Sequence, residues 1–228
     1  MNGTLALVGG REFTDGCSFD VGLADGVDEV LLIPSALAYE NPGAAIERAT
    51  EWFAALDTKV RVLEVYRRAE ALEPAAAEIA AAAELTYVVG GSPMHLRSVL
   101  KDTPLLEALV GAWRRGATVA AAGEAVSVLC SNMVDSRGGA YTVGLDLLTT
   151  VTLIPRYNQW STDKWHRTVE LAHAGLPVVG IDEATALIHT PEGEWRVEGA
   201  GDVHVFLDGR RVGLDALPPE LNPLLARD

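Results

Sequence analysis

The chain has 228 residues, of which 49% are hydrophobic and 22% are charged. This composition is typical of a globular protein and excludes disordered, collagen-like and coiled-coil chains. The 18 Lys and Arg residues are outnumbered by 32 Asp and Glu residues, which gives a formal net charge of −14. Such a charge repels nucleic-acid phosphates and anionic lipid, so we expect neither nucleic acid nor a membrane as a partner.

The sequence also carries signals about location. It has no run of about 20 uncharged apolar residues, and its first residues lack the basic and apolar regions of a secretory signal. Its two cysteines, Cys17 and Cys130, are too few for a disulfide framework. We therefore expect a cytoplasmic protein.

The first two thirds of the chain alternate short apolar runs with helical patterns. Five runs bounded by glycine or proline are typical of buried parallel strands: residues 4–8, 29–33, 60–65, 85–89 and 118–122. Helices are predicted from Asn41, over residues 75–84, from Thr103 to Gly116 and from Ser161 to Gly175. This alternation predicts a parallel sheet covered by helices on both faces.

The last quarter of the chain is different, because short strands follow one another with only turns between them. These strands are predicted at residues 178–181, 185–188, 194–197 and 203–206. We expect their antiparallel hairpins to extend the same sheet, since no linker precedes them. The prediction is a single domain over residues 1–228, a three-layer α/β sandwich with a mostly parallel central sheet.

Ligands of such sheets bind at the carboxyl ends of the strands. The loops at that edge are Gly9–Glu12, Pro34–Ser35, Gly90–Met94 and Ala122–Ala125. Their glycines allow a backbone to approach a ligand, or else simply end a strand. The last loop lies between a strand and a helix, where a nucleophile elbow presents its catalytic residue. It has the small residues of an elbow but no hydroxyl or thiol at its tip.

A set of segments in chain order carries a family resemblance. They are residues 6–10, 88–96, 113–116, 133–135 with 137–140, 179–183 with 185–187, and 197–203. Together they resemble the cyanophycinase and α-aspartyl dipeptidase family of serine peptidases. The resemblance implies a class I glutamine amidotransferase-like fold, and a serine nucleophile with a histidine base that act on Asp-X dipeptides or polyaspartyl-arginine.

The chain departs from that family at both catalytic positions. The family's elbow is of the Gly-x-Ser-Ala-Gly type, whereas Ala121–Ala125 places Gly123 at the serine position and Glu124 after it. The family's histidine follows a strand and a proline, and here Arg156 follows Pro155. Without a hydroxyl no acyl-enzyme forms, and a guanidinium that stays protonated is no general base. Nucleophile and base are both predicted to be lost.

Five other side chains carry groups that a catalytic site uses: hydroxyls, a thiol and carboxylates. Ser92, Ser127 and Cys130 are candidates for a relocated nucleophile, and each also fits a capping or packing role. Asp182 and Glu183 follow a buried-looking strand, and either orient the site or cap a turn.

The histidines do not show the spacing of metal ligands. His166 and His173 are expected on an exposed helix face, and His189 and His204 on the surface. There is no zinc signature, P-loop or dinucleotide fingerprint, so we expect no metal and no cofactor.

Three hypotheses remain open from the sequence. The first is a non-catalytic homologue that binds a small carboxylate or an acidic peptide terminus at its altered site. That site would comprise Gly90, Gly91, Ser92, Gly123, Glu124 and Arg156. The second is an active hydrolase with a relocated nucleophile or a chemistry based on Glu124. The third is an interaction protein that acts through the surface of a homo-oligomer. Under the first hypothesis, Arg156 either binds the ligand anion or forms an ion pair with Glu124.

Overall fold

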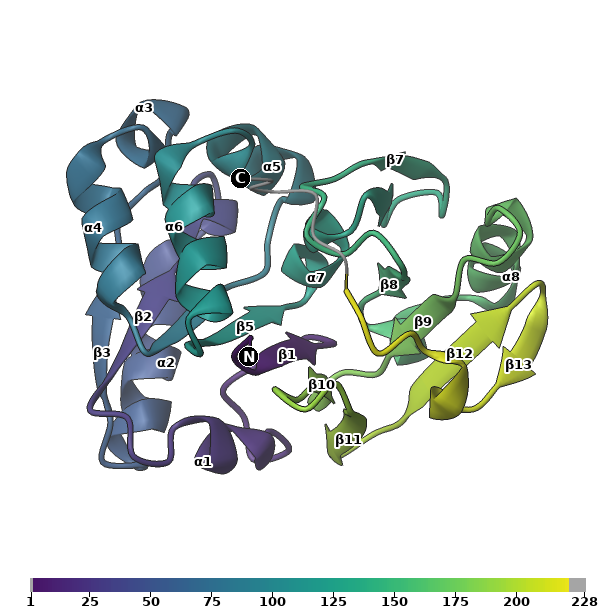
Figure 1. Cartoon of the computed structure of the whole chain (residues 1–228), viewed down its shortest axis with the longest axis horizontal. Helices are drawn as coiled ribbons and strands as arrows, with labels where there is room; N and C mark the ends of the chain where they lie inside the picture. The colour runs from purple at the N-terminus through teal and green to yellow at the C-terminus, as the bar shows by residue number, and fades with distance from the viewer. Residues whose placement is uncertain (1, 222–228) are drawn as a thin grey trace.

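The structure, a computed structural model, describes residues 2–221 and is built around a seven-stranded sheet (Figure 1). Its strand order is β11-β10-β1-β5-β4-β2-β3. The strands are β1 (Leu5–Val8), β2 (Glu29–Ile33), β3 (Lys59–Val62), β4 (Leu85–Val88), β5 (Thr118–Ala122), β10 (Thr185–His189) and β11 (Trp195–Gly199). Strands β1 to β5 are parallel, and β10 and β11 join antiparallel beside β1. The expected mostly parallel central sheet is confirmed.

Helices cover both faces of this sheet. The long ones are α2 (Pro42–Ala54), α4 (Pro74–Ala82) and α6 (Pro104–Arg114), and the shorter ones are α1 (Phe19–Leu23), α3 (Arg68–Ala71), α5 (Pro93–Leu100) and α7 (Glu124–Leu129). Helix α8 (Thr162–Leu171) packs elsewhere, with Val169 in a cluster apart from this sheet. Phe19 of α1 and Phe53 of α2 pack with Val30 on one face. Leu96 of α5 and Leu105 of α6 pack on the other. The expected three layers are therefore present, and of the shorter helices only α7, which follows the elbow, was expected from the sequence.

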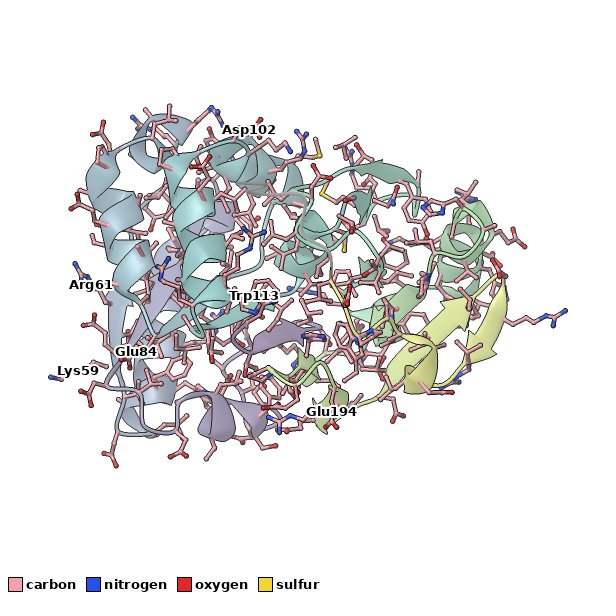
Figure 2. The ribbon with its side chains drawn as sticks, viewed as in Figure 1. Lys59, Arg61, Glu84, Asp102, Trp113 and Glu194 are labelled. Atoms are coloured by element: carbon pink, nitrogen blue, oxygen red, sulfur yellow. The ribbon has the colours of Figure 1, made fainter. Side chains whose placement is uncertain are left out.

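Strand β3 forms one edge of the central sheet and is shorter than expected. It ends at Val62 rather than Val65, because the chain turns at Leu63, whose carbonyl accepts a hydrogen bond from the Val65 amide. Lys59 and Arg61 project outward from this edge (Figure 2). Charged side chains on an edge strand oppose pairing with a second sheet, so this edge is poorly suited to self-association.

The C-terminal strands divide between two sheets. A separate four-stranded sheet has the order β13-β12-β9-β8, with β8 (Thr152–Ile154), β9 (Val178–Ile181), β12 (Val203–Leu207) and β13 (Arg210–Val212). It lies beside the central sheet and next to α8 (Figure 1). The expectation that every C-terminal hairpin extends the central sheet is therefore wrong for residues 178–181 and 203–206. Phe206 explains the difference, because it packs with Ile154, Val169 and Val178 in a cluster of their own.

The two sheets nevertheless share apolar contacts. Leu7 of the central sheet belongs to the same buried cluster as Val179 and Val205 of the second sheet. The single-domain interpretation of residues 1–228 agrees with this shared core and stays a prediction. A third, two-stranded sheet pairs β6 (Asn132–Val134) with β7 (Tyr141–Val143). Among residues 2–221, no helix combines the length and apolarity needed to cross a bilayer.

Candidate functional site

The turn between β5 and α7 has the geometry of a nucleophile elbow. Gly123 joins the two elements with φ 52° and ψ −135°, a conformation that side chains rarely adopt. Its amide donates to the carbonyl of Val8, at 2.9 Å, which fixes the turn above the centre of the sheet. A strained strand-turn-helix of this kind is what presents a catalytic serine in hydrolases that use an elbow. At its tip this chain has a residue without a side chain.

The second glycine loop lies directly against this elbow. A Cβ atom on Gly90 would stand 2.7 Å from the carbonyl oxygen of Ala122 and 3.2 Å from the Cα of Gly123. The two backbones approach so closely only because residue 90 is a glycine. Ser92 stands at the start of α5, and its amide donates to the carbonyl of Ala36 at 2.9 Å. The structure thus brings Gly90 to Gly123 and ties the backbone of Ser92 to the loop after β2.

Arg156 follows β8 and reaches over the elbow. Its backbone is in the left-handed region, with φ 50°, and its amide donates to the carbonyl of Gly9 at 2.7 Å. The side chain crosses Gly10, where a Cβ atom would stand 2.9 Å from Arg156 Cγ and Nε. A Cβ atom on Gly123 would lie 3.7 Å from Arg156 Nη2. The guanidinium therefore lies beside the space that a serine side chain would enter.

Glu124 supplies the nearest opposite charge to Arg156. Its Oε1 lies 3.7 Å from Arg156 Nε, and the two side chains are 20% and 42% exposed. This separation exceeds that of a hydrogen bond. The Nε atom itself is buried and has no hydrogen-bond partner. Of the two outcomes that the sequence left open, the ion pair is present, but it leaves the donor capacity of the guanidinium unsatisfied.

Two further charged groups reach the site from other elements. Glu12, in the loop after β1, is only 8% exposed. Burial raises the pKa of Glu12, while the positive charges of Arg156 and Arg48 lower it and the negative charge of Glu124 raises it. In α8, partial burial lowers the pKa of Lys164, and Asp135 and Glu124 act against that change. The sequence placed Glu12 in a strand-end loop without assigning it a role, and nothing in the pattern pointed to Lys164.

Glu183 holds the turn that follows Arg156. Its amide donates to Asn158 Oδ1 at 3.0 Å, and its carboxylate accepts from Gln159 Nε2 at 3.2 Å. Both partners lie in the 3-10 turn η2 (Tyr157–Gln159). Of the two roles left open for Glu183, these contacts favour orientation of the site, because they fix the backbone that carries the guanidinium.

Asp182 and the histidines of the C-terminal strands are more enclosed than the sequence suggested. Asp182 Oδ1 lies 3.3 Å from His204 Nε2, and the His204 ring stacks on Tyr157 with centroids 4.5 Å apart. The expected surface position of His189 is wrong, since the residue is 5% exposed and its Nε2 lies 2.8 Å from the carbonyl oxygen of Pro219. Alternating strand patterns do not tell which face is covered by a distant loop.

Two of the three candidates for a relocated nucleophile, Ser127 and Cys130, have other roles in the structure, whereas the Ser92 side chain makes no cap hydrogen bond. Ser127 Oγ donates to the carbonyl of Glu124 at 2.9 Å, within its own helix. Burial raises the pKa of Cys130 to about 12, so its thiol stays protonated near neutral pH. Neither side chain lies at the tip of the elbow. Within residues 2–221, no group of three or more His, Cys, Asp or Glu side chains is arranged to hold a metal ion.

Comparison with known proteins decides the family of this chain. The model of peptidase family S51 matches residues 18–195. The chain belongs to peptidase family S51. The resemblance noted in the sequence is thereby confirmed at the level of the family.

Solved structures support the S51 fold. A peptidase from an acI-B1 actinobacterium is 26% identical, with a TM-score of 0.82 and coverage of 93% of each chain. A structure assigned to a peptidase E protein from Listeria monocytogenes EGD-e is 18% identical, with a TM-score of 0.65. That match covers 88% of this chain and 100% of the other, and it bears on the fold alone. No curated protein matches the chain.

Proposed function

We propose that this S51 protein has lost peptide hydrolysis and binds a small carboxylate-bearing ligand through Arg156. The observation that carries the proposal is the juxtaposition at the elbow. Gly123 keeps the strained backbone of a nucleophile position while the Arg156 guanidinium lies beside it. An elbow that has a guanidinium but neither a serine nor a histidine is better suited to binding a carboxylate than to acyl transfer.

The loss of peptide hydrolysis follows from the two groups that acyl transfer requires. Acyl transfer needs a nucleophile that attacks the carbonyl carbon and a base that takes its proton. Gly123 has no atom for the first step, and Arg156 has no lone pair for the second. The alternative positions Ser127 and Cys130 are engaged in a helix hydrogen bond and deeply buried, respectively. An active hydrolase with a relocated nucleophile therefore finds no support at Ser127 or Cys130.

The chemistry of binding rests on the guanidinium. Its planar donors match the two oxygens of a carboxylate, and this paired hydrogen bonding is stronger than that between neutral groups. The Arg156 Nε–H is buried without a partner, and the rest of the side chain is partly open to solvent. A carboxylate would bind at the open part of this guanidinium, since Glu124 at 3.7 Å from Nε forms no hydrogen bond with it.

Charge on the whole protein limits the affinity. The net charge of −14 disfavours the approach of any anion, so the attraction is local to Arg156. Binding to a partly exposed guanidinium is screened by salt. We expect weak, salt-sensitive binding of a small carboxylate or an acidic peptide terminus. A cytoplasmic location and a homo-oligomeric state are further expectations, and both rest on the sequence.

Thermal unfolding in the presence of carboxylates tests this function. Ligands that bind the folded state raise the unfolding temperature by mass action. We expect acetate, succinate and a short acidic peptide to stabilise the wild type, and Arg156→Ala to abolish the effect. Arg156→Lys, which keeps the charge but not the planar fork, should retain only part of it. Stabilisation that persists in Arg156→Ala, or that appears only with cationic ligands, would refute the proposal.

A further inference from the structure

The charges around the elbow come from four different segments and balance one another. Glu12 follows β1, Glu124 begins α7, Arg156 follows β8, and Lys164 lies in α8. Arg156 Nε lies 3.7 Å from Glu124 Oε1, burial raises the pKa of Glu12 against the charge of Arg156, and burial lowers the pKa of Lys164 against the charge of Glu124. Two carboxylates and two cations thus form a charged group, which we call the elbow charge cluster. The nearby Asp135 and Arg137 form their own ion pair at 2.9 Å.

This balance has a consequence for the kind of anion that Arg156 can accept. A ligand carboxylate at the Arg156 guanidinium would lie beside Glu124, whose Oε1 is 3.7 Å from Nε. Glu12, whose pKa burial raises against the charge of Arg156, is only 8% exposed, so its interactions with charges at this site are poorly screened by water. A simple anion therefore competes with Glu124 for the Arg156 guanidinium and leaves the Glu124 carboxylate without its paired cation. Like charges this close disfavour binding unless a cation accompanies them.

A ligand with its own cation avoids that repulsion. We propose that Glu124 and Glu12 make this site selective for zwitterions, in which an ammonium group lies next to the carboxylate, over simple anions of the same size. This inference rests on the proposed function, because it assumes that Arg156 holds the carboxylate. The ammonium group would donate to Glu124, which has no hydrogen bond to Arg156 at their observed separation. The buried, unpartnered Nε–H of Arg156 is the independent sign that the cluster is not complete by itself.

Glu124 is the residue that sets this preference. It is the more accessible of the two carboxylates, and it directly follows the glycine at the tip of the elbow. A Cβ atom on Gly123 would lie in ordinary contact with Arg156 Nη2 at 3.7 Å, so the space that a side chain would fill there adjoins the guanidinium. Glu12 is buried, so it influences a ligand through its charge and not by direct contact. Removing the charge of Glu124 should therefore weaken the discrimination while leaving Arg156 able to bind a carboxylate.

A matched pair of ligands isolates the ammonium group. L-Alanine and L-lactate have the same carboxylate and methyl group, and differ by ammonium against hydroxyl. Saturation-transfer NMR titrations would be run with the wild type, Glu124→Gln, Arg156→Ala and Glu107→Gln, the last removing an exposed carboxylate on α6 as control. We expect the wild type to bind L-alanine about tenfold more tightly than L-lactate, as one partly screened charge interaction allows. Glu124→Gln should reduce the ratio to about threefold or less, partly by tightening the binding of L-lactate.

The outcomes separate this inference from the function on which it rests. Glu107→Gln should behave like the wild type, and Arg156→Ala should lose both ligands. If both ligands bind through Arg156 with the same ratio in wild type and Glu124→Gln, the selectivity is overturned while carboxylate binding stands. If L-lactate binds the wild type as well as L-alanine does, the selectivity is also overturned. If neither ligand binds, the proposed function fails together with the inference.

Discussion

Gly123 has a backbone conformation that a residue with a side chain adopts only with strain, so Gly123→Ala should lower stability. The added methyl group meets no atom closer than 3.7 Å, the nearest being Arg156 Nη2 and Gly90 Cα, so packing contributes little. The penalty is then that of the backbone, with φ 52° and ψ −135°, and amounts to roughly 1–3 kcal/mol. Reduced entropy of the unfolded chain offsets about 0.4–1 kcal/mol of this. We predict a net loss of about 1–2 kcal/mol in the free energy of unfolding.

Urea denaturation of two further glycine variants calibrates this value. Gly90→Ala should cost more than Gly123→Ala, since its Cβ atom would stand 2.7 Å from the Ala122 carbonyl oxygen. Gly22→Ala should stabilise the protein, because Gly22 lies in α1 with nothing within 4 Å of an added Cβ atom. If Gly123→Ala unfolds at the same urea concentration as the wild type or a higher one, the elbow is not strained and the argument from its geometry is wrong.

Three further variants test other parts of the structure. Burial raises the pKa of Asp20 from 3.8 to about 7, so its buried charge costs nothing below pH 4 and reaches a full cost, of the order of 4 kcal/mol, above pH 7. Asp20→Asn, which still accepts from Trp52, should therefore be more stable than the wild type at pH 8 and equal to it at pH 4 in denaturant titrations; a difference independent of pH would contradict this. Tyr87→Phe removes a buried hydroxyl without a partner and should leave the free energy of unfolding unchanged or about 1 kcal/mol higher, whereas a clear loss would reveal a partner. Glu183→Ala should weaken carboxylate binding at Arg156 about fivefold in thermal-shift titrations, as loss of the contacts that hold its turn implies, and an unchanged affinity would remove Glu183 from the site.

Local patterns were enough to predict the parallel part of the fold. Strands such as β2 and β5 are short apolar runs that end at proline or glycine, and buried parallel strands need little else to be recognised. The same patterns did not show to which sheet β9 and β12 belong. Membership depends on pairing with β8 and on the contacts of Phe206, which join segments far apart in the chain. The sequence of a strand predicts that it is a strand, but not which other strand it pairs with.

Residues of the candidate site could be predicted only where they directly follow a recognisable strand. Gly123 follows a strand at the elbow, and Arg156 follows a strand and a proline, so both were predicted by position, and their role at the site stays a prediction. Glu12 and Lys164 were missed because a glutamate in a loop and a lysine in a helix look like ordinary solvated residues. Only the folded structure shows that Glu12 is buried and that the charge of Glu124 acts on Lys164. The order of the segments therefore predicted the altered catalytic positions but not the charges that surround them.

Peptide hydrolysis by the unmodified protein is the most direct test of the central claim that the elbow no longer catalyses acyl transfer. Asp-X dipeptides and polyaspartyl-arginine, the substrates that the family resemblance suggests, would be incubated with high concentrations of wild type and of Arg156→Ala, and amine release measured. We predict no release above the buffer blank for either protein, since Gly123 supplies no nucleophile. Turnover by the wild type at about 1 s⁻¹ or faster, within the usual range of enzymes, and blocked by a serine-directed fluorophosphonate, would contradict the account.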